Sequence, residues 1–240
     1  MSRAAAFFDV DGTLVEKPSL ERRFFRALWY ERKIPARNAF VWLKEAVRHA
    51  PNGPTHALQG NKAYLRAIRS SGLQGNHAAS GAPLFSAAVE CVAQHVLNGE
   101  RIVLITGTLE FLAQEIADRL RRELAKRGCE TEIFVCATRV EEKNGRWTGR
   151  VLGPPMFGEA KAIAAWWFAE KWNLDLKNCS AYGDSENDRW LLASVGKPVA
   201  VNPARVLRRI AERQRWQIAN WCEPVFTKAK LLKMVPESMR

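Results

Sequence analysis

The chain has 240 residues, of which 47% are hydrophobic, and a formal net charge of +12. This length and apolar content suffice for one large α/β domain, or for a core domain with a smaller inserted domain. The longest apolar run of a predicted helix, residues 162–169, is too short to cross a bilayer. The first predicted strand starts so near Met1 that we expect no secretory signal.

The five cysteines are scattered and form no Cys-x-x-Cys pair. This spacing argues against a disulfide framework or a zinc site and favours reduced thiols in a cytoplasmic protein. The positive charge favours anionic partners such as phosphorylated metabolites, anionic lipid head groups or nucleic acid. Because the basic residues are spread over separate predicted helices without an aromatic-basic motif, we expect no nucleic-acid partner.

Residues 4–10 form a short apolar run that predicts a buried strand, and Gly12-Thr13 ends it. Apolar side chains at helical spacing then fill residues 16–81, which predicts an inserted all-helical cap without strands. Alternating elements follow, with helices predicted at 83–98, 109–126, 158–172, 186–194 and 203–214, and strands at 101–106, 131–137, 179–182 and 198–201. The dipeptide Asn144-Gly145 predicts the turn of a β-hairpin.

This alternation predicts an α/β protein with a Rossmann-like parallel sheet and helices on both faces. The expected core domain comprises residues 1–15 and 82–240, and residues 16–81 form the cap domain. Six tryptophans at helical apolar positions are expected to be mostly core: Trp29, Trp42, Trp166, Trp167, Trp172 and Trp190. A substrate pocket lined by Trp29 and Trp42 is the alternative for the cap pair. The four histidines are expected at surface or loop positions, and residues 216–239 as a helix packed on the core or lying on a membrane surface.

The end of the first strand places two carboxylates, Asp9 and Asp11, two residues apart with no basic residue between them. Open α/β sheets bind their ligands at the carboxyl ends of parallel strands. Two acids at such a position repel each other unless a cation or a phosphoryl group lies between them. An Asx-type turn or a helix cap is the alternative for this segment alone.

Two further segments have polar groups that suit a phosphoryl group. Thr106-Gly107-Thr108 follows an apolar strand, where a hydroxyl and free backbone N–H groups at a helix start form an oxyanion cradle. Lys161 lies near the start of a predicted helix, where the helix dipole disfavours a positive charge, which suggests that it neutralises phosphate. The alternatives are an N-cap threonine and a surface lysine.

A fourth segment, residues 183–188, has three acids within five residues directly after a predicted strand. Such a cluster is typical of magnesium coordination by oxygen ligands, with an acidic helix N-terminus as the alternative. Together the four segments supply what phosphoryl transfer requires: a nucleophile, charge clamps, a lysine and a metal site.

With these segments the chain resembles the haloacid dehalogenase-like hydrolase superfamily over residues 4–214. The helical cap between the first two segments and the hairpin-like residues 138–151 look like its phosphoserine-phosphatase-like subfamily. The resemblance implies that Asp9 attacks phosphorus and forms an aspartyl-phosphate. It also implies that Asp11 protonates the leaving oxygen and then deprotonates the attacking water, and that Lys161 neutralises charge.

The resemblance further implies the contacts of the substrate and of a Mg²⁺ cofactor. The phosphoryl group would contact Thr106, Gly107, Thr108, Lys161 and Asn187. The metal site would comprise Asp9, the backbone carbonyl of Asp11, Asp184 and Asp188, with Asp188 also orienting Lys161 or a bound water.

We therefore expect a magnesium-dependent phosphatase that acts on a small phosphate monoester. The alternatives are a phosphotransferase, or a protein that binds a phosphate ester or an anionic membrane without turnover. Between residues 17 and 80 the acids are Glu21, Glu31 and Glu45, against twelve lysines and arginines. A zwitterionic amino-acid substrate is therefore less expected than a more anionic or larger ester, such as a phosphorylated metabolite or a lysophospholipid-like ester.

Overall fold

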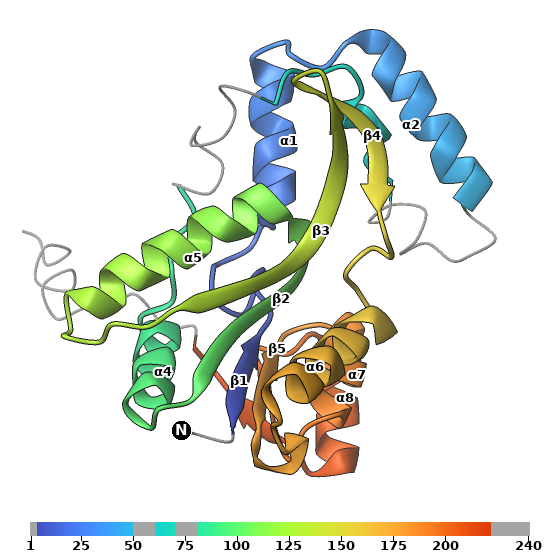
Figure 1. Cartoon of the computed structure of the whole chain (residues 1–240). Coiled ribbons are helices and arrows are strands. Elements are labelled where there is room, and N and C mark those ends of the chain that lie inside the picture. The colour runs from blue at the N-terminus through green and yellow to red at the C-terminus, as the bar shows by residue number, and fades with distance from the viewer. Residues whose placement is uncertain (1–3, 50–60, 71–80, 222–240) are drawn as a thin grey trace, which may run out of the picture.

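The computed structural model describes residues 4–49, 61–70 and 81–221 (Figure 1). Seven strands form one sheet in the order β4-β3-β2-β1-β5-β6-β7. Their bounds are β1 (Ala5–Phe8), β2 (Arg101–Leu109), β3 (Ile133–Lys143), β4 (Arg146–Leu152), β5 (Ser180–Gly183), β6 (Lys197–Val201) and β7 (Gln217–Ala219). All neighbours pair in parallel except β3 and β4, which form an antiparallel hairpin. The predicted α/β class with a parallel sheet is confirmed.

Helices cover both faces of this sheet. The helices and single turns are α1 (Leu20–Tyr30), α2 (Ala36–His49), η2 (Ala63–Leu65), α4 (Ser86–Leu97), α5 (Glu110–Ala125), α6 (Glu159–Trp172), η3 (Leu176–Asn178), η4 (Glu186–Asp188), α7 (Arg189–Ala193) and α8 (Arg205–Gln214). The side chain of Phe8 packs with residues of α4 and α5, whereas Phe7 packs with residues of α6, α7 and α8. Because alternate residues of β1 enter opposite core layers, the strand is apolar throughout.

The central position of β1 determines where the site lies. Its neighbours are β2 on one side and β5 on the other, with Phe8 opposite both Leu104 and Tyr182. The chain proceeds from β1 to β2 and β3 in one direction and later fills β5 and β6 in the other. Ligands of such sheets bind outside the carboxyl ends of the strands where the strand order reverses.

The insertion between β1 and α4 contains α1, α2 and η2 in its described parts, and the β3–β4 hairpin extends from the sheet to reach them (Figure 1). The Trp147 amide donates to the Ile68 carbonyl (2.9 Å), and the Ala67 amide donates to the Trp147 carbonyl (2.8 Å). A Cβ at Gly149 would lie only 3.0 Å from the Ala63 Cα, so glycine permits this close approach. The division of the chain at residues 15 and 82 stays a prediction.

The prediction of a mostly buried tryptophan set is wrong for three members. Trp29, Trp166 and Trp167 are 57%, 61% and 53% exposed. In α6 the small residues Ala164 and Ala165 face the sheet, so the neighbouring indoles point outward. Apolar residues all around this helix concealed which of its faces packs on the core.

Two other expectations also fail. His95 is buried rather than exposed, because its ring nitrogens lie 2.7 Å from a carboxylate oxygen of Glu100 and from the Tyr182 hydroxyl. The segment after Trp216 begins with the short strand β7 instead of a helix, and residues 222–240 of the predicted tail lie outside the described residues. Within the described ranges, no helix has the length and apolar character to span a membrane.

Candidate active site

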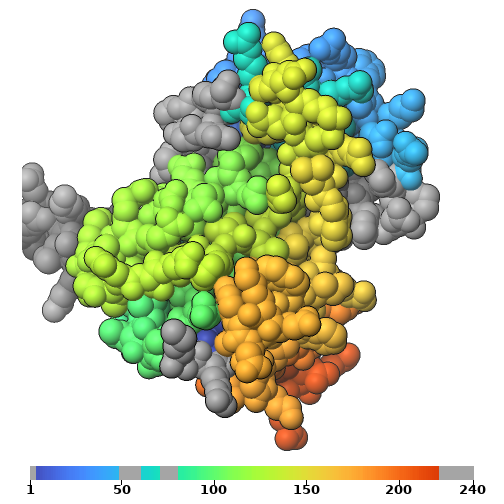
Figure 2. All heavy atoms as spheres, in the orientation of Figure 1, coloured from blue at the N-terminus to red at the C-terminus, as the bar shows by residue number. Residues whose placement is uncertain are grey.

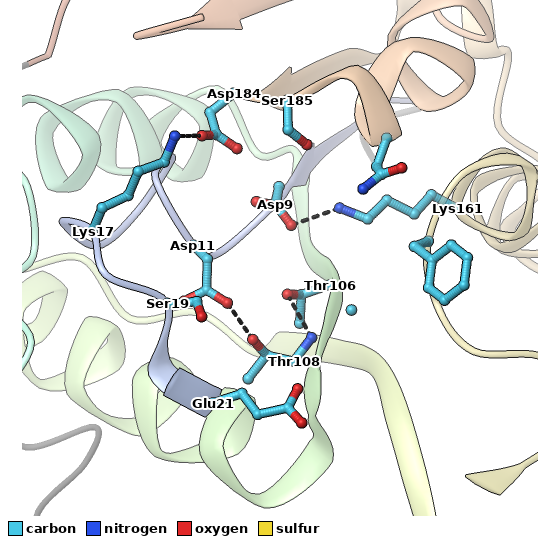
Figure 3. A pocket seen from close by; sticks show the side chains of 13 residues that line it. Asp9, Asp11, Lys17, Ser19, Glu21, Thr106, Thr108, Lys161, Asp184 and Ser185 are labelled. Carbon is cyan, nitrogen blue, oxygen red and sulfur yellow. Dashed lines mark hydrogen bonds and ion pairs between the residues drawn. The ribbon is translucent and has the colours of Figure 1, made fainter. Parts of the chain in front are cut away.

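A pocket of about 230 Å³ lies at the carboxyl ends of β1, β2 and β5 (Figure 3). The pocket brings together eight of the nine sequence-predicted site residues. The ninth, Asp188, does not line the pocket but contacts Lys161. The lining residues are Asp9, Asp11, Lys17, Ser19, Glu21, Thr106, Gly107, Thr108, Phe157, Lys161, Asp184, Ser185 and Asn187.

An ion-paired triad forms the base of the pocket. The Lys161 ammonium donates to Asp9 Oδ1 (2.6 Å) and to Asp188 Oδ1 (2.5 Å). All three side chains are buried. Burial alone would lower the pKa of Lys161, but the two adjacent carboxylates raise it, so the ammonium stays charged. A permanent positive charge therefore lies beside the carboxylate that ends the central strand.

Asp188 is held by hydrogen bonds from the turn after β5. Its Oδ2 accepts from the Asp184 amide (3.2 Å), the Ser185 amide (2.9 Å) and the Ser185 hydroxyl (2.8 Å). A Cβ at Gly183 would collide with the Asp188 side chain, so the turn requires glycine there. With both oxygens engaged, Asp188 is suited to positioning Lys161.

Asp11 lies where the core meets the first helix of the insertion. Its Oδ1 accepts from the Leu20 amide (2.8 Å), and its Oδ2 accepts from the Thr108 hydroxyl. Burial raises the pKa of Asp11, although both hydrogen bonds act in the opposite direction. A carboxyl group with a raised pKa can carry a proton to a leaving group at neutral pH.

The segment Thr106-Gly107-Thr108 differs from the expected strand-to-helix turn. It lies within β2, where the pairing with β3 jumps from Thr106 to Leu109, so Gly107 and Thr108 lie outside the regular ladder. The Thr108 amide donates to Thr106 Oγ1 (3.2 Å). The irregularity turns this polar segment toward the pocket before α5 begins at Glu110.

Oxygen atoms of Asp9, Asp184 and Asp188 lie within 4.8 Å of one another, and all three residues are buried. Burial raises the pKa of Asp9 well above its usual value despite the opposing effect of Lys161. Burial and the Asp188 charge raise the pKa of Asp184 to about 6. A cation would relieve this excess of negative charge, and the all-oxygen donor set fits a hard divalent metal.

Five lining residues were not among the predicted site residues: Lys17, Ser19, Glu21, Phe157 and Ser185. The Lys17 ammonium lies 2.7 Å from Asp184 Oδ2. Ser19 accepts a hydrogen bond from the Arg22 amide at the start of α1. The nearness of Lys17 and Ser19 to Asp11 in the sequence could have predicted that they line the pocket. No sequence feature indicated this for Phe157.

The family profile described as haloacid dehalogenase-like hydrolase matches residues 6–193. The chain belongs to the haloacid dehalogenase-like hydrolases. The matched range begins in β1 and ends with α7, so it contains every sequence-predicted site residue.

Relatives and solved structures agree with this membership. Phosphoserine phosphatase SerB1 of Mycobacterium tuberculosis (strain ATCC 25618 / H37Rv) is 31% identical over 230 residues, covering 91% of this chain and 71% of that protein. A structure of a protein of unknown function from Bordetella pertussis Tohama I has a TM-score of 0.66 at 28% identity, covering 92% of this chain and 100% of that one.

A substrate-bound phosphoserine phosphatase complex has a TM-score of 0.63 at 18% identity, covering 95% of this chain and 96% of that one, and shows the shared fold. The expected phosphoserine-phosphatase-like subfamily is confirmed.

Proposed function

We propose that this chain is a magnesium-dependent phosphatase that hydrolyses a small phosphate monoester through an aspartyl-phosphate on Asp9. One observation carries the proposal: Asp9 ends the central strand, Lys161 lies 2.6 Å from its carboxylate, and Asp11 lines the same pocket with a raised pKa. This arrangement supplies a nucleophile, a fixed cation and a proton donor around one small cavity.

In the first step, a carboxylate oxygen of Asp9 attacks phosphorus and the bond from phosphorus to the leaving oxygen breaks. Asp11 gives its proton to that oxygen, so the alcohol departs neutral. The Lys161 ammonium, the Thr106 hydroxyl and the backbone amide of Gly107 stabilise charge on the phosphoryl oxygens. Asn187, which lines the same pocket, contacts the phosphoryl group.

In the second step, a water molecule attacks the phosphorus of the aspartyl-phosphate. Asp11, now ionised, takes the proton of this water, and the bond between phosphorus and the Asp9 oxygen breaks. Inorganic phosphate leaves, and both aspartates return to their initial states. Asp11 acts as acid and then as base, which its buried position between Leu20 and Thr108 permits.

The metal ligands proposed here are Asp9, the Asp11 carbonyl and Asp184, with Asp188 completing the acid cluster. When bound, Mg²⁺ supplies positive charge that offsets the repulsion between a carboxylate nucleophile and an anionic phosphate. Asp188 already accepts hydrogen bonds on Oδ2 and pairs with Lys161 on Oδ1. Its contribution is therefore to hold Lys161 and the turn that presents Asp184.

Phosphate release from p-nitrophenyl phosphate in the presence of Mg²⁺ tests this function. We expect Asp9→Asn to lower kcat at least 1,000-fold, a loss on the order of 4 kcal/mol in transition-state stabilisation. The partly exposed Asp118, on α5, provides the matched control Asp118→Asn, which should retain wild-type activity. Full activity of Asp9→Asn would contradict the aspartyl-phosphate pathway.

The two alternative functions give different results in the same assay. A phosphotransferase would form product only after an alcohol acceptor such as glycerol is added, and the product would be a new phosphate ester. A binding protein would bind the ester without releasing phosphate at any Mg²⁺ concentration. Hydrolysis in plain buffer separates the proposal from both.

The substrate is proposed to be a small phosphorylated metabolite or a lysophospholipid-like ester in the cytoplasm. The described cysteines, Cys91, Cys129, Cys136 and Cys179, are all free thiols, which supports a reducing compartment. Because the name of SerB1 makes phosphoserine the obvious comparison, a panel should include it with sugar phosphates, glycerol phosphates and lysophospholipids. A preference for phosphoserine by orders of magnitude would contradict our substrate proposal.

A further inference from the structure

A groove of about 840 Å³ adjoins the catalytic pocket and is formed by α1, the loop after it, α2 and η2. Its lining residues are Ser19, Glu21, Arg22, Phe25, Trp29, Ile34, Ala39, Trp42, Asn61 and Tyr64. Ser19 and Glu21 also line the catalytic pocket, so the two cavities share a wall. The catalytic pocket alone, about 230 Å³, is below the roughly 300–1,000 Å³ of typical ligand sites.

Aromatic side chains form the walls of this groove. Phe25 stacks on Trp29 with ring centroids 6.2 Å apart and meets Tyr64 edge-on at 5.3 Å. Although both are large apolar side chains, Phe25 is 37% and Trp29 57% exposed. Exposed aromatic rings in a concave site next to a reaction centre favour an apolar ligand, because binding removes their surface from water.

The Glu21 carboxylate, which lines the groove, is already paired within the protein. Glu21 Oε2 accepts from the buried Lys62 ammonium (2.5 Å), and Glu21 Oε1 accepts from the Tyr64 hydroxyl (2.9 Å). Lys62 neutralises the Glu21 charge, so this carboxylate is poorly placed to bind the ammonium group of an amino-acid ester. The groove therefore favours an apolar group over a zwitterionic one.

The position of Asp11 indicates which cavity receives the leaving group. The leaving oxygen must approach Asp11 to take its proton, and Asp11 accepts a hydrogen bond from the amide of Leu20, between Ser19 and Glu21. Figure 3 shows Ser19 and Glu21 on the Asp11 side of the pocket, away from Lys161. A second groove, of about 770 Å³, meets the pocket at Phe157 and Asn187, on the side of Lys161.

We propose that the groove between α1, α2 and η2 binds the apolar organic part of the substrate, an alkyl chain or an aryl ring joined through oxygen to the phosphoryl group. The enzyme then prefers phosphate monoesters of longer or ring-bearing alcohols over those of short polar alcohols. This inference rests on the proposed phosphatase function and specifies its substrate class.

A homologous series of ethyl, butyl, hexyl and octyl phosphate, kept below micelle-forming concentrations, tests the inference. We expect kcat/KM to rise about twofold to fourfold for each added methylene, the gain from burying one methylene group. A parallel assay with 1-naphthyl phosphate distinguishes the two sources of apolar surface. Tighter binding of 1-naphthyl phosphate than of octyl phosphate to the Asp9→Asn protein assigns the groove to rings, and the reverse assigns it to chains.

Tryptophan variants connect this preference to the groove. Trp29→Ala and Trp42→Ala should each lower the octyl-to-ethyl ratio of kcat/KM at least tenfold. Trp166→Ala is the matched control, since Trp166 is 61% exposed on α6 and does not line the groove. An unchanged ratio in both groove variants would overturn the assignment.

Direct binding separates failure of this inference from failure of the proposed function. Calorimetric titration of the Asp9→Asn protein with Mg²⁺ should show octyl phosphate binding at least tenfold more tightly than ethyl phosphate. Equal affinities, or a flat chain-length series with clear turnover of every ester, would overturn the groove assignment and leave the phosphatase proposal intact. No turnover of any ester by the wild-type protein would instead contradict the phosphatase proposal.

Discussion

Gly12 shows how one residue controls the shape of the acid cluster. Its φ of +84° is a conformation that L side chains rarely adopt, and a Cβ there would collide with the Asp184 carboxylate. The methyl group of an alanine would therefore displace a proposed metal ligand as well as strain the backbone. The glycine of the Asp-Val-Asp-Gly segment is thus required both by the turn and by the approach of a second segment.

We expect Gly12→Ala to lower kcat at least tenfold and to weaken Mg²⁺ activation, measured by phosphate release over a Mg²⁺ titration. Gly128→Ala is the matched control, because Gly128 also has a positive φ (+74°) but has no atom within 4 Å of an added Cβ. Both variants strain the backbone by about 1 kcal/mol, and only the first displaces Asp184. Equal activities of the two variants would contradict this account.

The raised pKa of Asp184 predicts how metal-free protein responds to pH. Its pKa is about 6 in the fold against an ordinary value of 3.8. The folded state binds the proton of the Asp184 carboxyl group more tightly than the unfolded chain does. This group's contribution to the free energy of unfolding is therefore complete below pH 3.8 and is lost as the pH rises through about 6. The amide of an asparagine at position 184 does not titrate, so it makes no pH-dependent contribution to stability.

The free energies of unfolding of wild type and Asp184→Asn in EDTA test this linkage. Between pH 4 and pH 7, we expect the difference to shift in favour of the variant by about 1–3 kcal/mol. Urea unfolding at each pH gives both values. A difference that is independent of pH would mean that Asp184 titrates normally in the fold.

At the scale of elements, the β3–β4 hairpin joins the sheet to the insertion. Trp147 of β4 is buried, stacks on Phe111 with centroids 5.2 Å apart and meets the edge of Phe24 at 6.1 Å. Phe24 is in α1 and Phe111 is in α5, so one indole contacts both the insertion and the core. The Asn144-Gly145 turn predicted the hairpin, but no local pattern indicated what it packs against.

Because Trp147 fills this junction, we expect Trp147→Ala to lower the free energy of unfolding by about 3–5 kcal/mol. Trp166→Ala, which removes an indole that is 61% exposed, should change it by less than about 1 kcal/mol. Urea unfolding followed by circular dichroism gives both values. A loss of less than 1 kcal/mol in Trp147→Ala would mean that the junction is loosely packed.

The sequence predicted the features that depend on neighbouring residues in the chain. It missed those that depend on contacts between residues far apart in the chain. The strand and helix of each motif are local patterns, so the segments with Asp9, Lys161 and Asp184 were placed correctly at element ends, whereas the strand that contains Thr106 continues to Leu109. The groove depends on the pairing of Glu21 with Lys62, residues that are distant in the chain. Such long-range pairs leave no periodic signal. The same limit explains why the outward face of α6 was assigned to the core.

At the scale of the whole molecule, the order of the strands gathers the site. Because β1 lies between β2 and β5, residues near positions 9, 106 and 184 meet at one edge of the sheet although long segments separate them. Figure 2 shows the insertion and the hairpin gathered at one end of the molecule, and α6 and the C-terminal helices at the other. The acid cluster therefore joins the segment after β1 to the segment after β5.

A cation bound at this cluster connects Asp9 of the first strand to Asp184 after β5, and the unfolded chain has no such site. Mg²⁺ should therefore stabilise the native state by RT ln(1 + [Mg²⁺]/Kd), about 2.7 kcal/mol at 100 times Kd. For a chain of this size we expect a rise in Tm of about 5–10 °C, measured by scanning calorimetry at neutral pH.

Asp184→Asn should abolish most of this rise, whereas Asp118→Asn should retain it. Because burial and, after it, the charges of the neighbouring aspartates raise the pKa values of Asp9 and Asp184, protons compete with the metal, and the rise in Tm should shrink as the pH falls below 6. A Tm that does not respond to Mg²⁺ at any pH would contradict the proposed metal site.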